Sequence, residues 1–197
     1  MTRRRLAAAL AVLICAAPSG VAQAARPHDN TATATIEQDG GRAFDFEWSL
    51  QRERGGVIDH RNIAQAGARC TGCRATAIAF QVVIVQGRPE RVEPLNRAVA
   101  INDQCTQCVV YAGARQLVRV VDKPVRFTAR GVVTLADVRR DLRALEDQDL
   151  TVDQLAAAVE TQEARVLKVL TAELVPRSGK SWKLLRKHDR SDDDGDD

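Results

Sequence analysis

Hydrophobic and polar residues alternate strictly over residues 44–50. The large apolar positions are Phe44, Phe46, Trp48 and Leu50. This period of two predicts a strand with one buried face. The Gly55–Gly56 pair predicts a turn, and Val57–Ile58 predicts a short return strand. Residues 25–41 before the strand are small and polar, so we expect a flexible linker there.

The centre of the chain contains an internal repeat, residues 62–85 and 96–120. When the chain is aligned with itself at an offset of 35 residues, the first CxxC pair aligns with the second. Five alternate positions after each CxxC are then occupied by identical residues. The matched positions are Cys70, Cys73, Ala77, Ala79, Gln81, Val83 and Val85 with Cys105, Cys108, Ala112, Ala114, Gln116, Val118 and Val120. Matches at every second residue place them on one face of a strand. We therefore interpret each copy as a β-hairpin with its CxxC at the tip; two copies are too few for a solenoid.

The two faces of the repeated strand differ in size. The shared face carries small alanines, which allow another element to approach closely, and then a glutamine and two valines. The matched glutamines, Gln81 and Gln116, either form a polar site or satisfy each other's hydrogen bonds. The opposite face of the first copy is large; it consists of Ile78, Phe80, Val82 and Ile84.

From Thr134 the period changes to that of a helix. Apolar residues at positions 135, 138, 142 and 145 predict a first amphipathic helix, and those at 155, 159, 166, 170 and 174 predict a second. Thr134 with Asp137 and Thr151 with Gln154 predict N-terminal caps, and Pro176 is expected to end the second helix. The short connection predicts an antiparallel helical hairpin, which we expect to cover the small-residue face of the sheet. The predicted fold is therefore α+β: two CxxC-tipped β-hairpins in an antiparallel sheet packed against a C-terminal helical hairpin, in a single domain over 42–175.

Residues 1–24 have the three parts of a secretory signal peptide. Arg3–Arg5 form a positive segment, 6–17 are apolar, and cleavage is expected after Ala24. The arginines also partly fit a twin-arginine signal. The signal holds three of the 29 basic residues and no acid, which leaves 26 basic and 26 acidic residues. A neutral mature chain gives no reason to expect nucleic-acid binding, and we expect no transmembrane segment after the signal is removed.

The four cysteines of the CxxC pairs, Cys70, Cys73, Cys105 and Cys108, are the most specific chemical signal. In an exported chain they favour disulfides, with pairing within each CxxC or between the copies both open. Two CxxC pairs on two hairpins also have the layout of a four-cysteine zinc site, although the glycines that usually follow such cysteines are absent. A redox role is the weakest interpretation, because strands rather than helices are predicted to follow both pairs.

Other candidate residues carry weaker signals. No motif of a known catalytic class is present, and His60 beside Asp59 fits a surface pair better than a general base. Residues 176–197 are predicted to be a charged, disordered tail. Its basic part could lie on an anionic surface through Lys180, Trp182, Lys183, Arg186 and Lys187.

The doubled CxxC with its AxAxQ strands, the string VRFTARG and the helix that follows carry a resemblance over about residues 60–175. The region resembles secreted actinobacterial proteins without an assigned activity, and regions of bacterial membrane proteins labelled peptide zinc metalloproteases. The protease motif HExxH is absent from this chain. The resemblance therefore implies a mobile extracytoplasmic module rather than an activity.

These observations together predict a secreted or cell-envelope-associated protein. We expect a non-catalytic binding or structural module stabilised by disulfides, with no cofactor. Its expected partner is a cell-envelope component or another protein. The alternatives are a zinc-binding module and a thiol-disulfide oxidoreductase that use the same four cysteines.

Overall fold

A computed structural model describes residues 28–177 of the chain. In this range, strands contain about half of the residues, and two helices lie between β9 and β10. The elements are β1 (Asn30–Ile36), β2 (Arg42–Arg54), β3 (Val57–Ile58), β4 (Arg61–Ala68), β5 (Arg74–Gln86), β6 (Arg91–Val92), β7 (Leu95–Asn102), β8 (Val109–Val121), β9 (Val125–Phe127), α1 (Ala129–Arg143), a short 3-10 helix (Ala144–Asp147), α2 (Val152–Ala172) and β10 (Leu174–Pro176).

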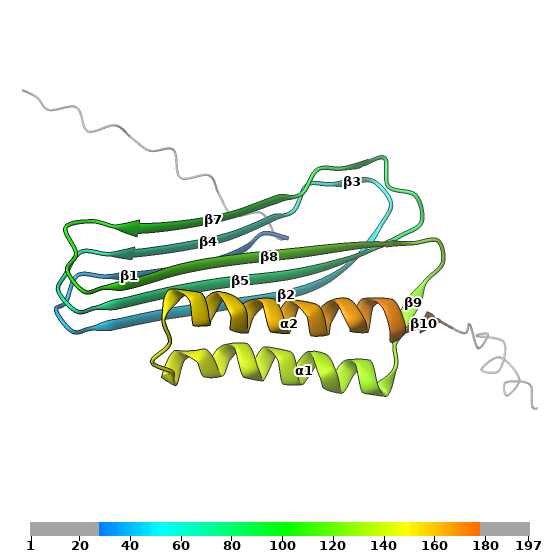
Figure 1. Cartoon of the computed structure of the whole chain (residues 1–197). Helices are drawn as coiled ribbons and strands as arrows, with labels where there is room; N and C mark the ends of the chain where they lie inside the picture. The colour runs from blue at the N-terminus through cyan, green and yellow to red at the C-terminus, as the bar shows by residue number, and fades with distance from the viewer. Residues whose placement is uncertain (1–27, 178–197) are drawn as a thin grey trace, which may run out of the picture.

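The long strands form a solenoid of three stacked rungs (Figure 1). Each rung is one strand of an outer sheet, a short connection that we call the arch, and one strand of an inner sheet. Rung 1 is β1 and β2, rung 2 is β4 and β5, and rung 3 is β7 and β8. The outer sheet has the order β1-β4-β7 and the inner sheet β2-β5-β8, and all their pairings are parallel. The short strands β3 and β6 pair at the end opposite the arches.

The prediction of an antiparallel sheet of hairpins is wrong, because the long strands pair in parallel. Strands and helices are both present and the helical pair is C-terminal, as predicted, but the two strands of a rung enter different sheets instead of pairing with each other. The repeat offset becomes the register of the sheet: Ala79 lies beside Ala114, and Gln81 beside Gln116. Alternation of period two is the same in both arrangements, so the alternation alone does not separate them.

The segment predicted as a flexible linker, 25–41, contains β1, so that prediction is wrong over Asn30–Ile36. The inward side chains of β1 are buried, and the strand pairs with β4 so that Asn30 lies beside Asn62 and Ala32 beside Ala64. Rung 1 is thus a copy of the repeat without a CxxC. With it the chain does form a solenoid, contrary to our expectation from two copies. The predicted strand at 44–50 and the short strand at 57–58 are confirmed as β2 and β3.

Alanine fills the space between the two sheets. The buried residues of this layer are Ala32, Ala34, Ala64, Ala66, Ala68, Ala75, Ala77, Ala79 and Ala114, together with Cys70 and Cys73. Methyl side chains on both facing surfaces let the outer sheet lie close against the inner sheet. The small-residue face therefore packs on a second sheet, and not on the helices as predicted.

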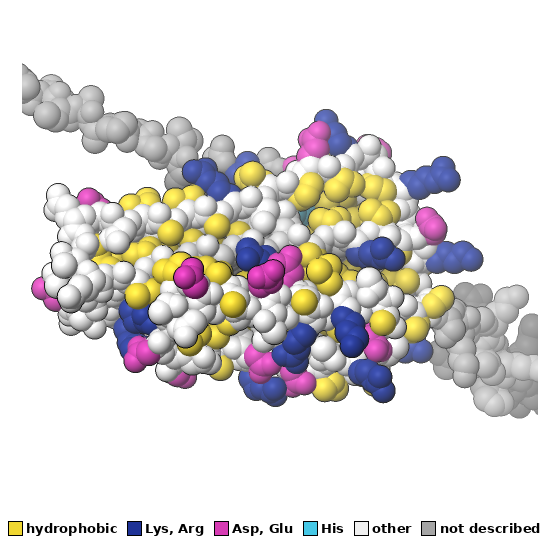
Figure 2. All heavy atoms as spheres, viewed as in Figure 1, with side chains coloured by type: hydrophobic (Ala, Val, Ile, Leu, Met, Phe, Trp, Pro, Cys, Tyr) yellow, Lys and Arg dark blue, Asp and Glu magenta, His cyan; other side chains and the backbone are white. Residues whose placement is uncertain are grey.

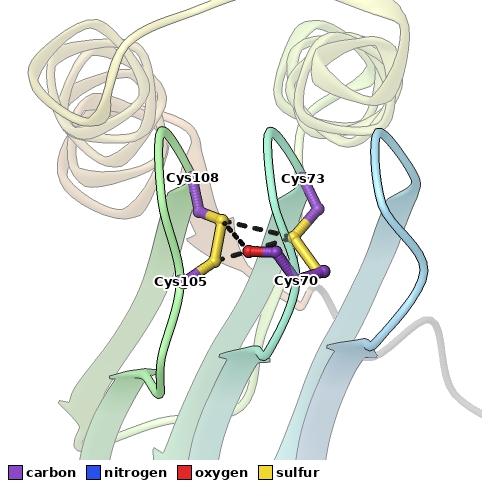
Figure 3. A group of neighbouring side chains, drawn as sticks. All are labelled: Cys70, Cys73, Cys105 and Cys108. Atoms are coloured by element: carbon purple, nitrogen blue, oxygen red, sulfur yellow. Dashed lines mark hydrogen bonds between the residues drawn. A yellow bond between two sulfur atoms is a disulfide. The ribbon is translucent and has the colours of Figure 1, made fainter.

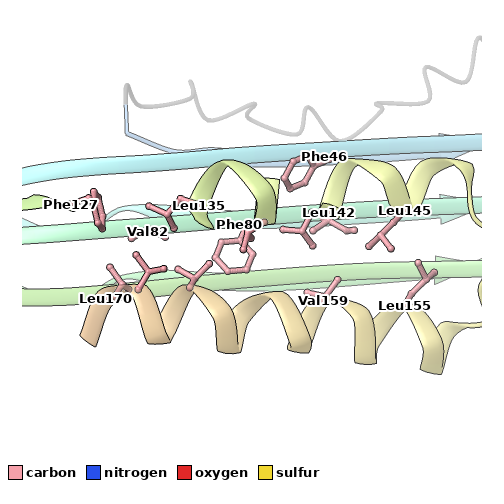
Figure 4. Packing of buried hydrophobic residues seen from close by; sticks show 14 of the residues in the cluster. Phe46, Phe80, Val82, Phe127, Leu135, Leu142, Leu145, Leu155, Val159 and Leu170 are labelled. Carbon is pink, nitrogen blue, oxygen red and sulfur yellow. The ribbon is translucent and has the colours of Figure 1, made fainter. Parts of the chain in front are cut away.

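The helices cover the opposite, large-residue face of the inner sheet (Figures 1 and 4). Ile78, Phe80 and Val82 of β5 belong to the same buried cluster as the apolar stripes of α1 and α2. Bulky side chains need the wider spacing between a sheet and a helix layer, and an alanine face leaves no such gap to fill. This difference in side-chain size explains which face each layer covers.

The ends of the helices agree with the sequence in part. The capping box of Thr151 and Gln154 is confirmed at the start of α2. α1, in contrast, begins at Ala129 with Thr128 as its N-cap, ahead of the predicted start at Thr134. α2 ends at Ala172, before Pro176, because residues 174–176 form β10 against β9.

An asparagine ladder runs through the three rungs at the inner side of the outer sheet. Asn30 donates from Nδ2 to Oδ1 of Asn62 at 2.8 Å, and Asn62 donates in the same way to Asn96 at 2.8 Å. Asn62 also donates to the carbonyl oxygen of Ala79, across the gap between the sheets, at 3.0 Å. The ladder gives these amides partners inside an apolar layer, where an unpaired amide would be costly.

The two repeated glutamines form a second ladder. Gln116 donates from Nε2 to Oε1 of Gln81 at 2.6 Å. Gln81 donates to the carbonyl oxygen of His28 at 2.9 Å, and Gln116 to that of His60 at 3.0 Å. Of the two interpretations of this pair, mutual satisfaction of hydrogen bonds is the one that the structure shows.

Within residues 28–177, no helix combines the length and the apolar character needed to cross a bilayer.

Candidate functional site

The two CxxC sequences form the arches of rungs 2 and 3, one on top of the other (Figure 3). Thr71 and Thr106 form a parallel bridge, and the N–H of Gly72 donates to the carbonyl of Thr106 at 2.8 Å. Gly72 has a φ of +67°, and Gln107 at the equivalent place has +58°. The arches thus extend the parallel register of the strands around the turn, and this brings both cysteine pairs together.

Each cysteine is bonded to its neighbour in the same arch. Cys70 is joined to Cys73 and Cys105 to Cys108, with Cα–Cα distances of 6.1 and 6.0 Å. Of the three pairings that four cysteines allow, this is the one within each CxxC. The rung 2 pair is buried at the end of the alanine layer, and the rung 3 pair is half-buried.

The four sulfur atoms also lie close to one another. Sγ of Cys73 is 3.3 Å from Sγ of Cys108 and 3.7 Å from Sγ of Cys105, and all four lie within 4.8 Å. In a tetrahedral zinc site with Zn–S bonds of about 2.3 Å, sulfur atoms are about 3.8 Å apart. The same arrangement therefore suits two disulfides when the cysteines are oxidised, and a metal when all four are thiolates.

Rung 3 leaves one end of the solenoid uncovered. We call it the open end: the side of β7 and β8 that faces away from rung 2. In the described part of the chain, β7 and β8 are the last strands of their sheets. Ala98 and Ala100 of β7 are exposed, whereas their register partners Ala64 and Ala66 are buried. Figure 2 shows hydrophobic side chains along β7 and β8 at this end. The open end therefore carries the pattern of a solenoid interior at the surface.

The other end, at rung 1, is blocked. Ala32 and Ala34 are buried although β1 is also the last strand of its sheet. Asp45 and Glu47 occupy the inward positions of β2 that are alanine in rungs 2 and 3. Asp45 accepts a hydrogen bond at 2.6 Å from the backbone N–H of Thr33. A carboxylate bound to the edge of a strand prevents another strand from pairing there.

The open end has a positive charge. Arg97 of β7 and Arg119 of β8 are exposed, and neither side chain has a hydrogen bond or ion pair with any residue in 28–177. Arg115, closer to the helices, pairs with Glu163 of α2 at 2.8 Å. The two unpaired arginines favour a negatively charged neighbour at this end.

The remaining sequence-predicted residues fall in two places. Lys180, Trp182, Lys183, Arg186 and Lys187 lie outside the described residues, as does the signal peptide. His60 is buried rather than at the surface, so the prediction of an exposed pair with Asp59 is wrong.

The open end was not predicted, because hairpins were expected where the structure has stacked rungs. The signal that indicates it is the asparagine at the start of each outer strand, followed by two alanines at alternate positions; it recurs at Asn30, Asn62 and Asn96. Three such copies identify the rungs without reference to cysteine.

Comparisons with protein-family models, with curated proteins and with solved structures match nothing in this chain.

Proposed function

We propose that this chain is an exported, non-catalytic binding module that takes an extended segment of a protein partner as a further strand at its open end. The observation that carries the proposal is the exposure of Ala98 and Ala100, at positions whose equivalents in the other two rungs are buried. Each disulfide holds its own arch in a fixed conformation, which favours a strand edge that is formed before the partner arrives.

The chemistry of the open end favours a polypeptide as the occupant. An edge strand presents a row of backbone N–H and C=O groups, and an extended peptide has the matching row. A row of alanines beside that edge suits small side chains at alternate positions of the added strand. Arg97 and Arg119 favour acidic side chains at the positions that face outward.

The blocked end makes head-to-tail stacking of copies of this chain unfavourable. Such stacking would bring rung 1 of one copy onto the open end of the next. Asp45 and Glu47 would then enter an alanine layer, where a charge without a partner is costly. The occupant is therefore a different chain rather than an open-ended series of copies.

A peptide that imitates a rung is expected to bind the open end. The probe is a synthetic peptide with the sequence of residues 59–68, added to the isotopically labelled full chain. We expect the amide signals of β7 to shift and to become protected from exchange. In the register of rung 2, the position of Ile63 lies beside Arg97. A peptide with Glu there should bind about 2- to 5-fold more tightly than one with Lys, because an exposed ion pair contributes up to about 1 kcal/mol.

Two matched variants test where the peptide binds. Ala98→Lys places a charge on the open edge and should abolish the shifts. Thr31→Lys, an equally exposed position on the blocked edge, should leave them unchanged. Shifts spread evenly over the protein, or an unchanged response of Ala98→Lys, would contradict the proposal. A dimer in sedimentation that Ala98→Lys converts to monomer would make a second copy the occupant, and would also contradict it.

A four-cysteine zinc site is the second candidate, and the clustering of the four sulfur atoms favours it. Zinc requires four thiolates, so this role excludes the two disulfides. A thiol-disulfide oxidoreductase has less support, because strands β5 and β8, and not helices, directly follow the two CxxC sequences.

The intact mass of the exported protein distinguishes these roles. We expect no cysteine of the mature chain to react with an alkylating reagent until a reductant is added, and peptide mapping to give the pairs Cys70–Cys73 and Cys105–Cys108. Four cysteines that react after a chelator alone, with one zinc in the native mass spectrum, would replace the disulfide proposal by the zinc one. Labelling that varies with the redox buffer would favour the oxidoreductase.

A further inference from the structure

His28 and His60 are equivalent residues of rungs 1 and 2. Each stands two positions before a ladder asparagine, and Asn30 and Asn62 are register partners. The parallel stacking places one imidazole on the other, with ring centroids 5.1 Å apart and the ring planes inclined by 21°. Two imidazoles are thus brought together by the same register that stacks the alanines.

A carboxylate from the end of β2 reaches both rings. Oε1 of Glu53 is 3.6 Å from Nδ1 of His28 and 3.7 Å from Nε2 of His60. One ligand atom from each of the three residues lies within 4.8 Å of the others. Ligand atoms around a tetrahedral ion with bonds of about 2.0–2.1 Å are about 3.3 Å apart. The distances from Glu53 to the two nitrogens exceed this spacing by only a few tenths of an ångström, and the two imidazole nitrogens are no more than 4.8 Å apart.

The environment of His60 suits a metal ligand. The residue is only 5% exposed, and Nδ1 is buried without a hydrogen-bond partner in the described structure. Burial lowers the pKa of His60, while the charges of Glu53, Asp59 and Asp29 act in the opposite direction and His28 acts with burial.

Backbone hydrogen bonds, access to solvent and nearby carboxylates also favour the binding of a cation by these three residues. The backbone carbonyls of His28 and His60 accept hydrogen bonds from Gln81 and Gln116, which holds both residues in place. The side chain of His28 is 54% exposed, so the cluster is open to solvent on one side. The carboxylates near the rings give the cluster a negative charge, which attracts a cation.

We propose that His28, His60 and Glu53 bind one divalent transition-metal ion, with Zn²⁺ as the reference ion. Two imidazoles and one carboxylate leave at least one coordination position for water or for a group of a bound partner. The site lies where β1 and β4 begin and β2 ends, at the end of rungs 1 and 2 opposite the arches, and is separate from the four cysteines.

Zinc binding to the full mature chain, without a histidine tag, tests the site. The disulfides are kept oxidised and checked by a thiol assay, so that the cysteines cannot bind the ion. Calorimetric titration with Zn²⁺ should give one ion per chain, and the imidazole nitrogen signals of both histidines should shift. His28→Ala and Glu53→Gln, both at positions open to solvent, should each weaken binding at least tenfold.

The chain offers its own matched control. His188 is the third histidine of the sequence and is distant in sequence from the other two, so His188→Ala should bind zinc like the unmodified chain. Two results would overturn the proposal: no binding by the unmodified chain, or equal binding by His28→Ala and the unmodified chain. Zinc retained by His28→Ala and released on blocking free thiols would assign the ion to the cysteines instead.

Discussion

Replacement of Phe80 by alanine is expected to lower the free energy of unfolding by about 3–5 kcal/mol. Phe80 is fully buried at the centre of the layer between the inner sheet and the helices, and stacks on Trp48 of rung 1 at 5.0 Å. Its removal leaves a cavity between the sheet and the two helices, and these layers cannot move close enough to fill it. Urea unfolding of the oxidised protein, followed by circular dichroism and tryptophan fluorescence, measures the change.

The same column of the inner sheet supplies a control. Arg115 is the register partner of Phe80 in rung 3 and lies partly in solvent, paired with Glu163. Arg115→Ala should cost no more than about 1 kcal/mol, because it removes one partly exposed ion pair. If Phe80→Ala does not fold, Phe80→Leu should still cost about 1–2 kcal/mol. Equal effects of the changes at positions 80 and 115 would show that the helices do not pack on this face.

Loss of the central ladder asparagine is expected to have the second-largest effect. Asn62→Ala removes the hydrogen bonds to Asn30, to Asn96 and to the carbonyl of Ala79. Each buried group that loses its hydrogen-bond partner lowers the stability by about 1–3 kcal/mol, whereas groups near the open end form hydrogen bonds with water instead. We therefore expect a total loss of about 2–4 kcal/mol, measured by the same unfolding experiment.

Asn96→Ala is the matched change at the open end. Asn96 is exposed and the buried Nδ2 of Asn62 keeps its hydrogen bond to Ala79, so the cost should be about 1 kcal/mol. A similar cost at positions 62 and 96 would mean that the ladder does not distinguish the interior rung from the terminal one.

The elements that were predicted correctly depend on local patterns. The strict alternation at 44–50 and the apolar stripe of α2 reflect which side chains face the core, and the glycine pair reflects the turn that follows the strand. The capping box at Thr151 requires only four consecutive residues. Signals of this kind are contained within one element and hold whatever that element packs against.

The arrangement of the strands required information that no single element contains. A hairpin and a rung have the same alternation and the same turn residues at the CxxC. What separates them is identity between copies, because stacked rungs place like residues side by side: Asn62 on Asn96, and Gln81 on Gln116. Ladders of identical amides favour parallel stacking, and read in this way the offset of 35 residues indicates a register rather than a duplicated hairpin.

The two candidate sites differed in how far the sequence revealed them. The cysteines were identified from their spacing, although only the stacking of the arches brings all four sulfur atoms together. Sequence spacing does not connect His28 with His60, because rung 1 has no cysteine to align it with rung 2. Once Asn30 is aligned with Asn62, the two histidines fall at equivalent positions.

The disulfides join cysteines that are close in the chain, whereas the strand partners are far apart in the chain, and this difference affects folding. Residues that pair across rungs are 32–35 positions apart in the chain, and this high contact order favours slow folding. Each disulfide, in contrast, joins cysteines only three positions apart, and so short a loop closes much faster than the sheets assemble. Oxidation that precedes folding therefore forms the same two bonds as oxidation that follows it. The covalent structure is independent of the order in which the rungs assemble, and no premature cross-link holds two rungs in the wrong register.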